Sequence, residues 1–182
     1  MTRYLLDTNI ISNVIKPEPS GSLLAWMGAQ KDDDLFIASL TVAEIRRGIL
    51  EKPKGKKRSS LETWFAGTEG PQALFAGRIL SFDDKAGLIW ARLMANGKAK
   101  GRSRSALDTI IAAVAEANEC VVVTDNEKDF EDVQIINPLI ALRAGRWVSD
   151  DSAHGPPDSF RRFQRQRVRT PRVRLPPLRW LD

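Results

Sequence analysis

Histidine and cysteine are almost absent from this chain of 182 residues, which has one of each, His154 and Cys120. A Ser-His-Asp or Cys-His catalytic site needs a histidine in the folded part, and His154 lies in the C-terminal 40 residues. Zinc sites built on Cys and His are excluded for the same reason. A single thiol cannot form an internal disulfide, and Cys120, in an apolar run, is expected to be buried and inert. Among the usual catalytic and metal-binding side chains, the carboxylates of Asp and Glu therefore remain as candidates.

Long apolar runs and glycine-rich phosphate loops are also missing. No stretch of about eighteen uncharged apolar residues exists, so no membrane span is expected. Asp7 interrupts the first apolar run too early for a signal peptide. Neither G-x-x-x-x-G-K-[ST] nor G-x-G-x-x-G occurs, so nucleotide-cradling loops are unsupported. We therefore expect a cytoplasmic protein without membrane contact.

Charge and proline divide the chain into two parts. Residues 1–142 hold 18 Lys+Arg and 19 Asp+Glu, whereas residues 143–182 hold 10 Arg, no Lys and 4 Asp. The second part also has five of the ten prolines. We predict one domain over 1–142 and an Arg/Pro-rich, disordered tail over 143–182. Three interpretations of the tail stay open: an RNA-binding extension, a solvated accessory segment, or sequence read in a shifted frame.

Short apolar segments alternate with amphipathic ones along residues 1–142. The pattern predicts strands at 3–7, 35–38, 79–82, 120–124 and 133–136. It predicts helices at 8–16, 20–30, 41–51, 60–77, 83–96 and 105–118. Such alternation indicates an α/β fold with a mainly parallel sheet.

Four acidic residues stand at the predicted ends of strands or starts of helices. Asp7 and Asp125 follow strands, and Glu44 and Asp108 lie near helix starts. Each alone is better explained as a helix cap, a capping-box acid or a loop acid. The carboxyl ends of parallel strands share one edge, however, and carboxylates packed there without a cation would repel one another. A hard divalent cation such as Mg²⁺ is the physical reason for such a cluster.

These acids stand in motifs that resemble the PIN-domain family, especially VapC-type toxins of the FitB-like branch from prokaryotic toxin–antitoxin pairs. The resemblance covers about residues 3–140. Its motifs are Leu5-Leu6-Asp7-Thr8-Asn9, Ser39-Leu40-Thr41-Val42-Ala43-Glu44-Ile45-Arg46-Arg47-Gly48, Leu107-Asp108-Thr109-Ile110-Ile111-Ala112, Val123-Thr124-Asp125-Asn126 with Asp129-Phe130, and Ile136-Asn137-Pro138.

The resemblance implies a three-layer α/β/α fold and a Mg²⁺- or Mn²⁺-dependent ribonuclease. Such a toxin is held inactive by a cognate antitoxin and is usually a homodimer. The candidate catalytic residues are Asp7, Glu44, Asp108 and Asp125, of which the first three are the expected metal ligands. Asp125, Asn126 and Asp129 all remain open for the fourth acidic position. The expected supporting residues are Thr8, Asn9, Thr124 and Asn126.

Two basic stretches are candidates for holding RNA phosphates, although solvated loops explain either equally well. The first is Lys52, Lys54, Lys56, Lys57 and Arg58; the second is Lys98, Lys100, Arg102 and Arg104, with Arg46 beside Glu44 as a further candidate. The main alternative to a ribonuclease toxin is a PIN-like module that binds nucleic acid or a partner without catalysis. A DNA-directed metal nuclease or a phosphatase on the same scaffold is the third.

Overall fold

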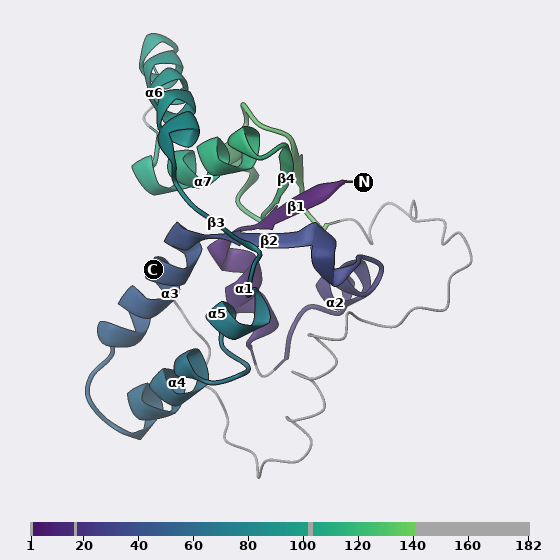
Figure 1. The fold of residues 1–182 in the computed structure, drawn as a ribbon, viewed down its shortest axis with the longest axis vertical. Coiled ribbons are helices and arrows are strands. Elements are labelled where there is room, and N and C mark those ends of the chain that lie inside the picture. The colour runs from purple at the N-terminus through teal and green to yellow at the C-terminus, as the bar shows by residue number, and fades with distance from the viewer. Residues whose placement is uncertain (1, 17, 102–103, 141–182) are drawn as a thin grey trace.

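A five-stranded parallel sheet forms the centre of the molecule (Figure 1). The structure, a computed structural model, describes residues 2–16, 18–101 and 104–140. The strand order is β3-β2-β1-β4-β5, so β1 is the central strand. The strands are β1 (Arg3–Leu6), β2 (Leu35–Ala38), β3 (Ile79–Leu80), β4 (Cys120–Val123) and β5 (Ile135–Ile136). All four pairings are parallel, as the alternating sequence pattern predicts.

Helices cover both faces of the sheet, which gives the expected three-layer α/β/α architecture. One face carries α1 (Thr8–Val14), α2 (Gly21–Gly28), α3 (Ser39–Leu50), α4 (Lys56–Ala66) and α5 (Pro71–Leu74). The other carries α6 (Asp84–Ala99) and α7 (Ala106–Ala117), seen above the sheet in Figure 1. Two short 3₁₀ turns, η1 (Asp32–Asp34) and η2 (Glu127–Phe130), complete the described elements.

The two helical layers explain why the strands are apolar throughout. Side chains alternate across a strand, so Leu6 packs with α1, α2 and α3, whereas Leu5 packs with α6 and α7. Both leucines are fully buried. A strand covered on both faces needs apolar residues at consecutive positions. Cys120 is buried in the second cluster, as expected, and burial raises the pKa of its thiol.

Several predicted helix boundaries differ from the structure; α6, for example, runs to Ala99 rather than to residue 96. α3 begins at Ser39 with Ala38 as N-cap and no side-chain cap, so the capping box at 41–44 does not form and Glu44 lies in the second turn. The predicted helix 60–77 is two helices, and α4 begins earlier, at Lys56. The chain turns between them at Gly70, where any side chain would collide with the carbonyl of Phe65. α4 ends at Ala66 before this turn, and α5 starts after it at Pro71.

The C-terminal limit of the domain stays a prediction. The described part ends at residue 140, so both the boundary at 142 and the tail over 143–182 lie outside it. Within the described ranges, no helix is long and apolar enough to cross a membrane.

Candidate active site

Three chain segments meet beside the carboxyl end of β1, the central strand. Asp7 follows β1, α3 follows β2 directly, and Thr124 follows β4. The backbone N–H of Asp7 donates to the carbonyl of Val123 at 3.0 Å, which extends the β1–β4 pairing by one residue. The parallel register therefore places Asp7 beside Thr124, although 117 residues separate them in sequence.

Asp7 is buried, with 4% of its surface exposed, and both of its carboxylate oxygens accept hydrogen bonds. Oδ1 accepts from the backbone N–H of Thr8 at 2.6 Å, which makes Asp7 the N-cap of α1. Oδ2 accepts from the hydroxyl of Thr124 at 2.8 Å. The capping role expected from the sequence is confirmed. The capping bond leaves the Asp7 carboxylate able to bind a further partner, because each carboxylate oxygen has a second lone pair.

The hydroxyl of Thr124 joins three neighbours. It donates its single proton to Asp7, and it accepts from the side-chain amide of Asn9 at 2.9 Å and from the backbone N–H of Asn126 at 3.0 Å. A hydroxyl has one donor and two acceptor lone pairs, so Thr124 is fully used. Thr124 is completely buried, and this network fixes the orientation of the Asp7 carboxylate.

The amide oxygen of Asn9 is buried and has no hydrogen-bond partner. When Asp7 is ionised, Thr124 donates its single proton to Asp7 and can only accept from Asn9 Nδ2, which fixes the orientation of the amide. An unsatisfied buried acceptor beside a carboxylate needs an explanation. A bound water, a cation or a substrate hydroxyl would supply the missing partner.

Glu44 is tied to the same site through Thr8. The Thr8 hydroxyl donates to Oε2 of Glu44 at 2.6 Å, a length typical of hydrogen bonds to carboxylates. Glu44 is half-buried on α3, and this bond orients its carboxylate toward the start of α1. The sequence gives no direct signal for this contact, since 36 residues separate the two partners.

Asp108 lies in the first turn of α7 and is half-buried. Ser105 is the N-cap, and its hydroxyl oxygen accepts from the backbone N–H of Asp108 at 3.3 Å, as the sequence pattern predicts. Burial raises the pKa of Asp108, and the negative charge of Asp129 raises it further. The influence of Asp129 indicates that η2 brings a fourth carboxylate toward the start of α7.

The pKa of Asp7 is raised to about 7, chiefly by burial. Its hydrogen bonds from Thr124 and Thr8 act in the opposite direction, and the charges of Asp108 and Glu44 raise the pKa further. The charges of Asp108 and Glu44 thus act on the Asp7 carboxylate, and the convergence of these acids on one metal ion stays a prediction. Among the described residues, none of these three acids forms an ion pair with Lys or Arg.

The three candidates for the fourth position lie in different environments. Asp125 is exposed. Asn126 is half-buried, and its side-chain amide donates to the carboxylate of Asp129. Asp129 is half-buried on η2, which packs against α7. The geometry therefore brings Asp129, held by Asn126, into the neighbourhood of Asp108.

The carboxylates form a loose group rather than a closed metal cage. Within residues 2–16, 18–101 and 104–140, no three Asp, Glu, His or Cys side chains converge tightly enough to make a preformed metal site. The donor set is nevertheless all oxygen, and it includes the unpartnered amide oxygen of Asn9. Mg²⁺ suits such a set, because it keeps several waters and needs only one or two direct carboxylates.

Several of the basic residues that the sequence suggests for RNA binding form ion pairs with acidic side chains of the same domain. Arg46 pairs with Glu62 at 3.8 Å and lies over the ring of Phe65. Lys100 and Arg104 both pair with Asp132. Lys98 is exposed on α6 rather than in a loop, and within the described part of the chain it has no ion pair. Arg102 lies outside the described residues.

The comparisons with known proteins agree with this architecture. The family model described as "PIN domain" matches residues 4–136. VapC ribonuclease Y4jK of Sinorhizobium fredii is 40% identical over 136 residues, which are 74% of this chain and 96% of that protein. Toxin FitB of Neisseria gonorrhoeae is 36% identical over the same shares. The crystal structure of FitAcB from Neisseria gonorrhoeae has a TM-score of 0.69 at 35% identity and covers 74% of this chain and 97% of that one.

The chain therefore belongs to the PIN-domain family, and its relatives include VapC- and FitB-type proteins. This confirms the resemblance seen in the sequence motifs and the three-layer fold expected from it.

Proposed function

We propose that this protein is a metal-dependent endoribonuclease toxin that hydrolyses RNA phosphodiester bonds. The observation that carries the proposal is the loose cluster of acids near the carboxyl end of β1, where the charges of Glu44 and Asp108 act on buried Asp7, whose pKa is raised to about 7, and none of the three has a basic partner among the described residues. Such a cluster is costly in a purely structural role. The names of the relatives, a VapC ribonuclease and a toxin, support the same activity.

Asp7 and Asp108 are the residues that would hold Mg²⁺ or Mn²⁺, with Glu44 either completing the coordination or orienting the attacking water. A bound divalent ion supplies a water of lowered pKa and polarises the phosphoryl oxygen. Thr124 holds Asp7 and Thr8 holds Glu44, so the carboxylates keep fixed directions during the reaction. The free amide oxygen of Asn9 would accept from a coordinated water or a ribose hydroxyl.

We propose Asp129 for the fourth acidic position, because it lies near Asp108 and is held by Asn126, whereas Asp125 is exposed. The test compares the conservative variants Asp129→Asn and Asp125→Asn, which remove the same charge four residues apart. Asp129→Asn should lower the cleavage rate about tenfold or more, with Asp125→Asn close to wild type. The reverse order would assign the position to Asp125.

The proposed partners are based on the family and on the names of the relatives. They are an RNA substrate, a cognate antitoxin that blocks the site, and a second copy of this chain as a homodimer, with the cytoplasm as the location. A growth-arrest assay tests the toxin role: wild type should stop growth, and Asp7→Asn should not. Co-expression of the protein encoded next to this gene should restore growth if that protein is the antitoxin.

The alternative, a nucleic-acid or partner-binding module without catalysis, predicts a different result in the same experiment. Purified wild type would bind RNA without cleaving it, with or without Mg²⁺, and Asp7→Asn would bind equally well. Cleavage that needs Mg²⁺ and is lost in Asp7→Asn would reject this alternative.

A further inference from the structure

The side chain of Arg104 lies between three elements of the fold rather than in solvent. Only 10% of it is exposed, and its guanidinium pairs with the carboxylate of Asp132. Arg104 immediately precedes Ser105, the N-cap of α7, and Asp132 follows the end of η2 by two residues. The pair therefore joins the start of α7 to the segment that carries Asp129.

A glycine of α6 makes room for this side chain. A Cβ atom added at Gly97 would lie 2.6 Å from both Cδ and Nε of Arg104, closer than such atoms can approach. These atoms are in the middle of a side chain whose end is held by Asp132, so they cannot swing away without breaking the pair. The Arg104 side chain therefore packs directly against buried Gly97 of α6.

Asp132 also holds the other side of the α6–α7 connection. Its Oδ1 atom accepts from Nζ of Lys100 at 3.1 Å, and Lys100 is the C-cap of α6. The Asp132 carboxylate thereby pairs with Lys100 at the end of α6 and with Arg104 just before α7. Lys100 and Arg104 therefore both form ion pairs within the fold, although the sequence pattern predicts that they belong to a basic loop.

We propose that Arg104 is a positioning residue, which through Asp132 and Gly97 fixes the start of α7 against the η2 segment and so sets the separation of Asp108 and Asp129. Arg104 is four residues before Asp108, which lies in the first turn of α7, and Asp129 is three residues before Asp132. α7 and η2 also pack directly. This inference rests on the proposed function, since it concerns the spacing of two carboxylates of the same site.

The competing role for Arg104 is contact with an RNA phosphate, and Asp132→Asn separates the two roles by the direction of its effect. If Arg104 positions the acids, Asp132→Asn removes its anchor, and the cleavage rate constant kcat should fall about tenfold or more with KM little changed. If Arg104 binds RNA, the same variant frees its charge, and KM should fall.

A double-mutant cycle makes the test stricter. Arg104→Gln, Asp132→Asn and the combination of both should lower kcat by similar factors, because the pair acts as one unit. Gly97→Ala should lower it too, although alanine is the better helix former and would otherwise stabilise α6. Arg92→Gln, which removes an exposed ion pair between α6 and Glu116 of α7, is the matched control and should retain near wild-type activity.

The second readout is Mn²⁺ binding to the RNA-free protein, measured by calorimetry alongside thermal melting. Folded Asp132→Asn and Gly97→Ala proteins should bind Mn²⁺ about tenfold or more weakly, and Arg92→Gln should match wild type. Unchanged kcat and Mn²⁺ affinity in folded Asp132→Asn would overturn the inference. A wild type that cleaves no RNA would instead defeat the proposed function, and the Mn²⁺ affinities would still decide the positioning role.

Discussion

The hydroxyl of Thr124 makes three hydrogen bonds, one to the carboxylate of Asp7 and two from Asn9 and Asn126. Valine has the same shape but no hydroxyl, so Thr124→Val would leave buried polar groups unpaired and release the Asp7 carboxylate. We expect this variant to lose about tenfold to a hundredfold in cleavage rate. Thr124→Ser keeps the hydroxyl and should retain most of the activity.

The comparison of these two variants in a steady-state cleavage assay checks the role of the hydroxyl. Thr124→Val should also unfold at a lower temperature, by an amount that corresponds to about 1–3 kcal/mol per unsatisfied group. Equal activity of the valine and serine variants would show that the hydroxyl does not orient Asp7.

The raised pKa of Asp7 also predicts how the free energy of unfolding depends on pH when metal is removed. Its pKa rises from 3.8 to about 7 on folding, so the folded state binds this proton more tightly than the unfolded state. The resulting stabilisation is complete below about pH 4 and is lost as the pH rises to about 7. A shift of this size corresponds to a loss on the order of 4 kcal/mol.

Asp7→Asn removes this titration, so in EDTA the melting temperature of wild type should fall relative to that of the variant between about pH 4 and pH 8. Asparagine keeps one of the two accepted hydrogen bonds, which makes the slope with pH, rather than the absolute stability, the quantity to compare. Mg²⁺ should reduce the difference at the upper end of this range, because a cation favours the charged carboxylate. Parallel melting curves for both proteins would contradict the pKa assigned to Asp7.

At the scale of elements, the sequence predicts those features that depend on local patterns. The strand that ends before Asp7 and the helix capped by Ser105 are both found, because apolar periodicity and caps are local properties. The start of α3 was not predictable, since Ala38 caps it without a side-chain hydrogen bond. The pair of Arg104 with Asp132 joins residues 28 positions apart and depends on the space left by Gly97, which no local pattern encodes.

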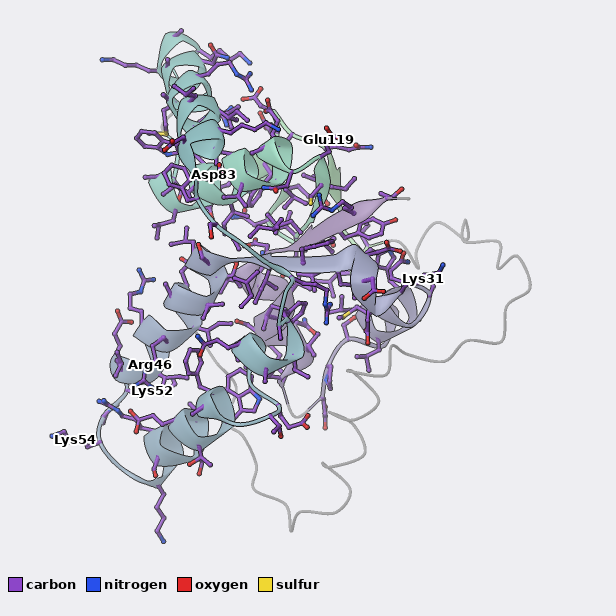
Figure 2. All side chains as sticks on the ribbon, in the orientation of Figure 1. Lys31, Arg46, Lys52, Lys54, Asp83 and Glu119 are labelled. Atoms are coloured by element: carbon purple, nitrogen blue, oxygen red, sulfur yellow. The ribbon has the colours of Figure 1, made fainter. Side chains whose placement is uncertain are left out.

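We propose that the connection between α3 and α4 holds phosphates of the RNA substrate. Arg58 closes it by donating to the carbonyls of Leu50 and Lys52 and to Glu62. Lys54, Lys56 and Lys57 line a hollow there and have no ion pair within the described residues. Figure 2 shows Lys54 extending outward at the tip of this connection, with Lys31 on the opposite side of the view.

Replacement of Lys54, Lys56 and Lys57 by Gln should weaken RNA binding and raise KM without changing kcat. For single-stranded RNA, each phosphate contact adds about 0.7 to the slope of log K against log salt, so the triple variant should lose about 2 from that slope. Binding measured by fluorescence anisotropy across salt concentrations gives the slope, with Lys31→Gln as the surface control. An unchanged slope would place the RNA elsewhere.

At the scale of the whole molecule, the sheet of the described residues is complete at β5, which ends at Ile136, where the match to the PIN domain also ends. Residues 143–182 carry a net charge of +6 without contributing to the motifs of the site. We expect a chain truncated after residue 142 to keep its cleavage rate. A loss of RNA affinity with unchanged kcat in the truncated protein would instead assign an RNA-binding role to the tail.

The central claim is that the carboxylates around Asp7 act together on a divalent ion to cleave RNA. The most direct test is the RNA cleavage rate of purified wild type and Asp108→Asn as Mg²⁺ is titrated from an EDTA-treated start. Wild type should be inactive in EDTA and reach a saturating rate with Mg²⁺, and Asp108→Asn should stay near background while melting as a folded protein. Equal rates for both proteins, or full activity of wild type in EDTA, would contradict the claim.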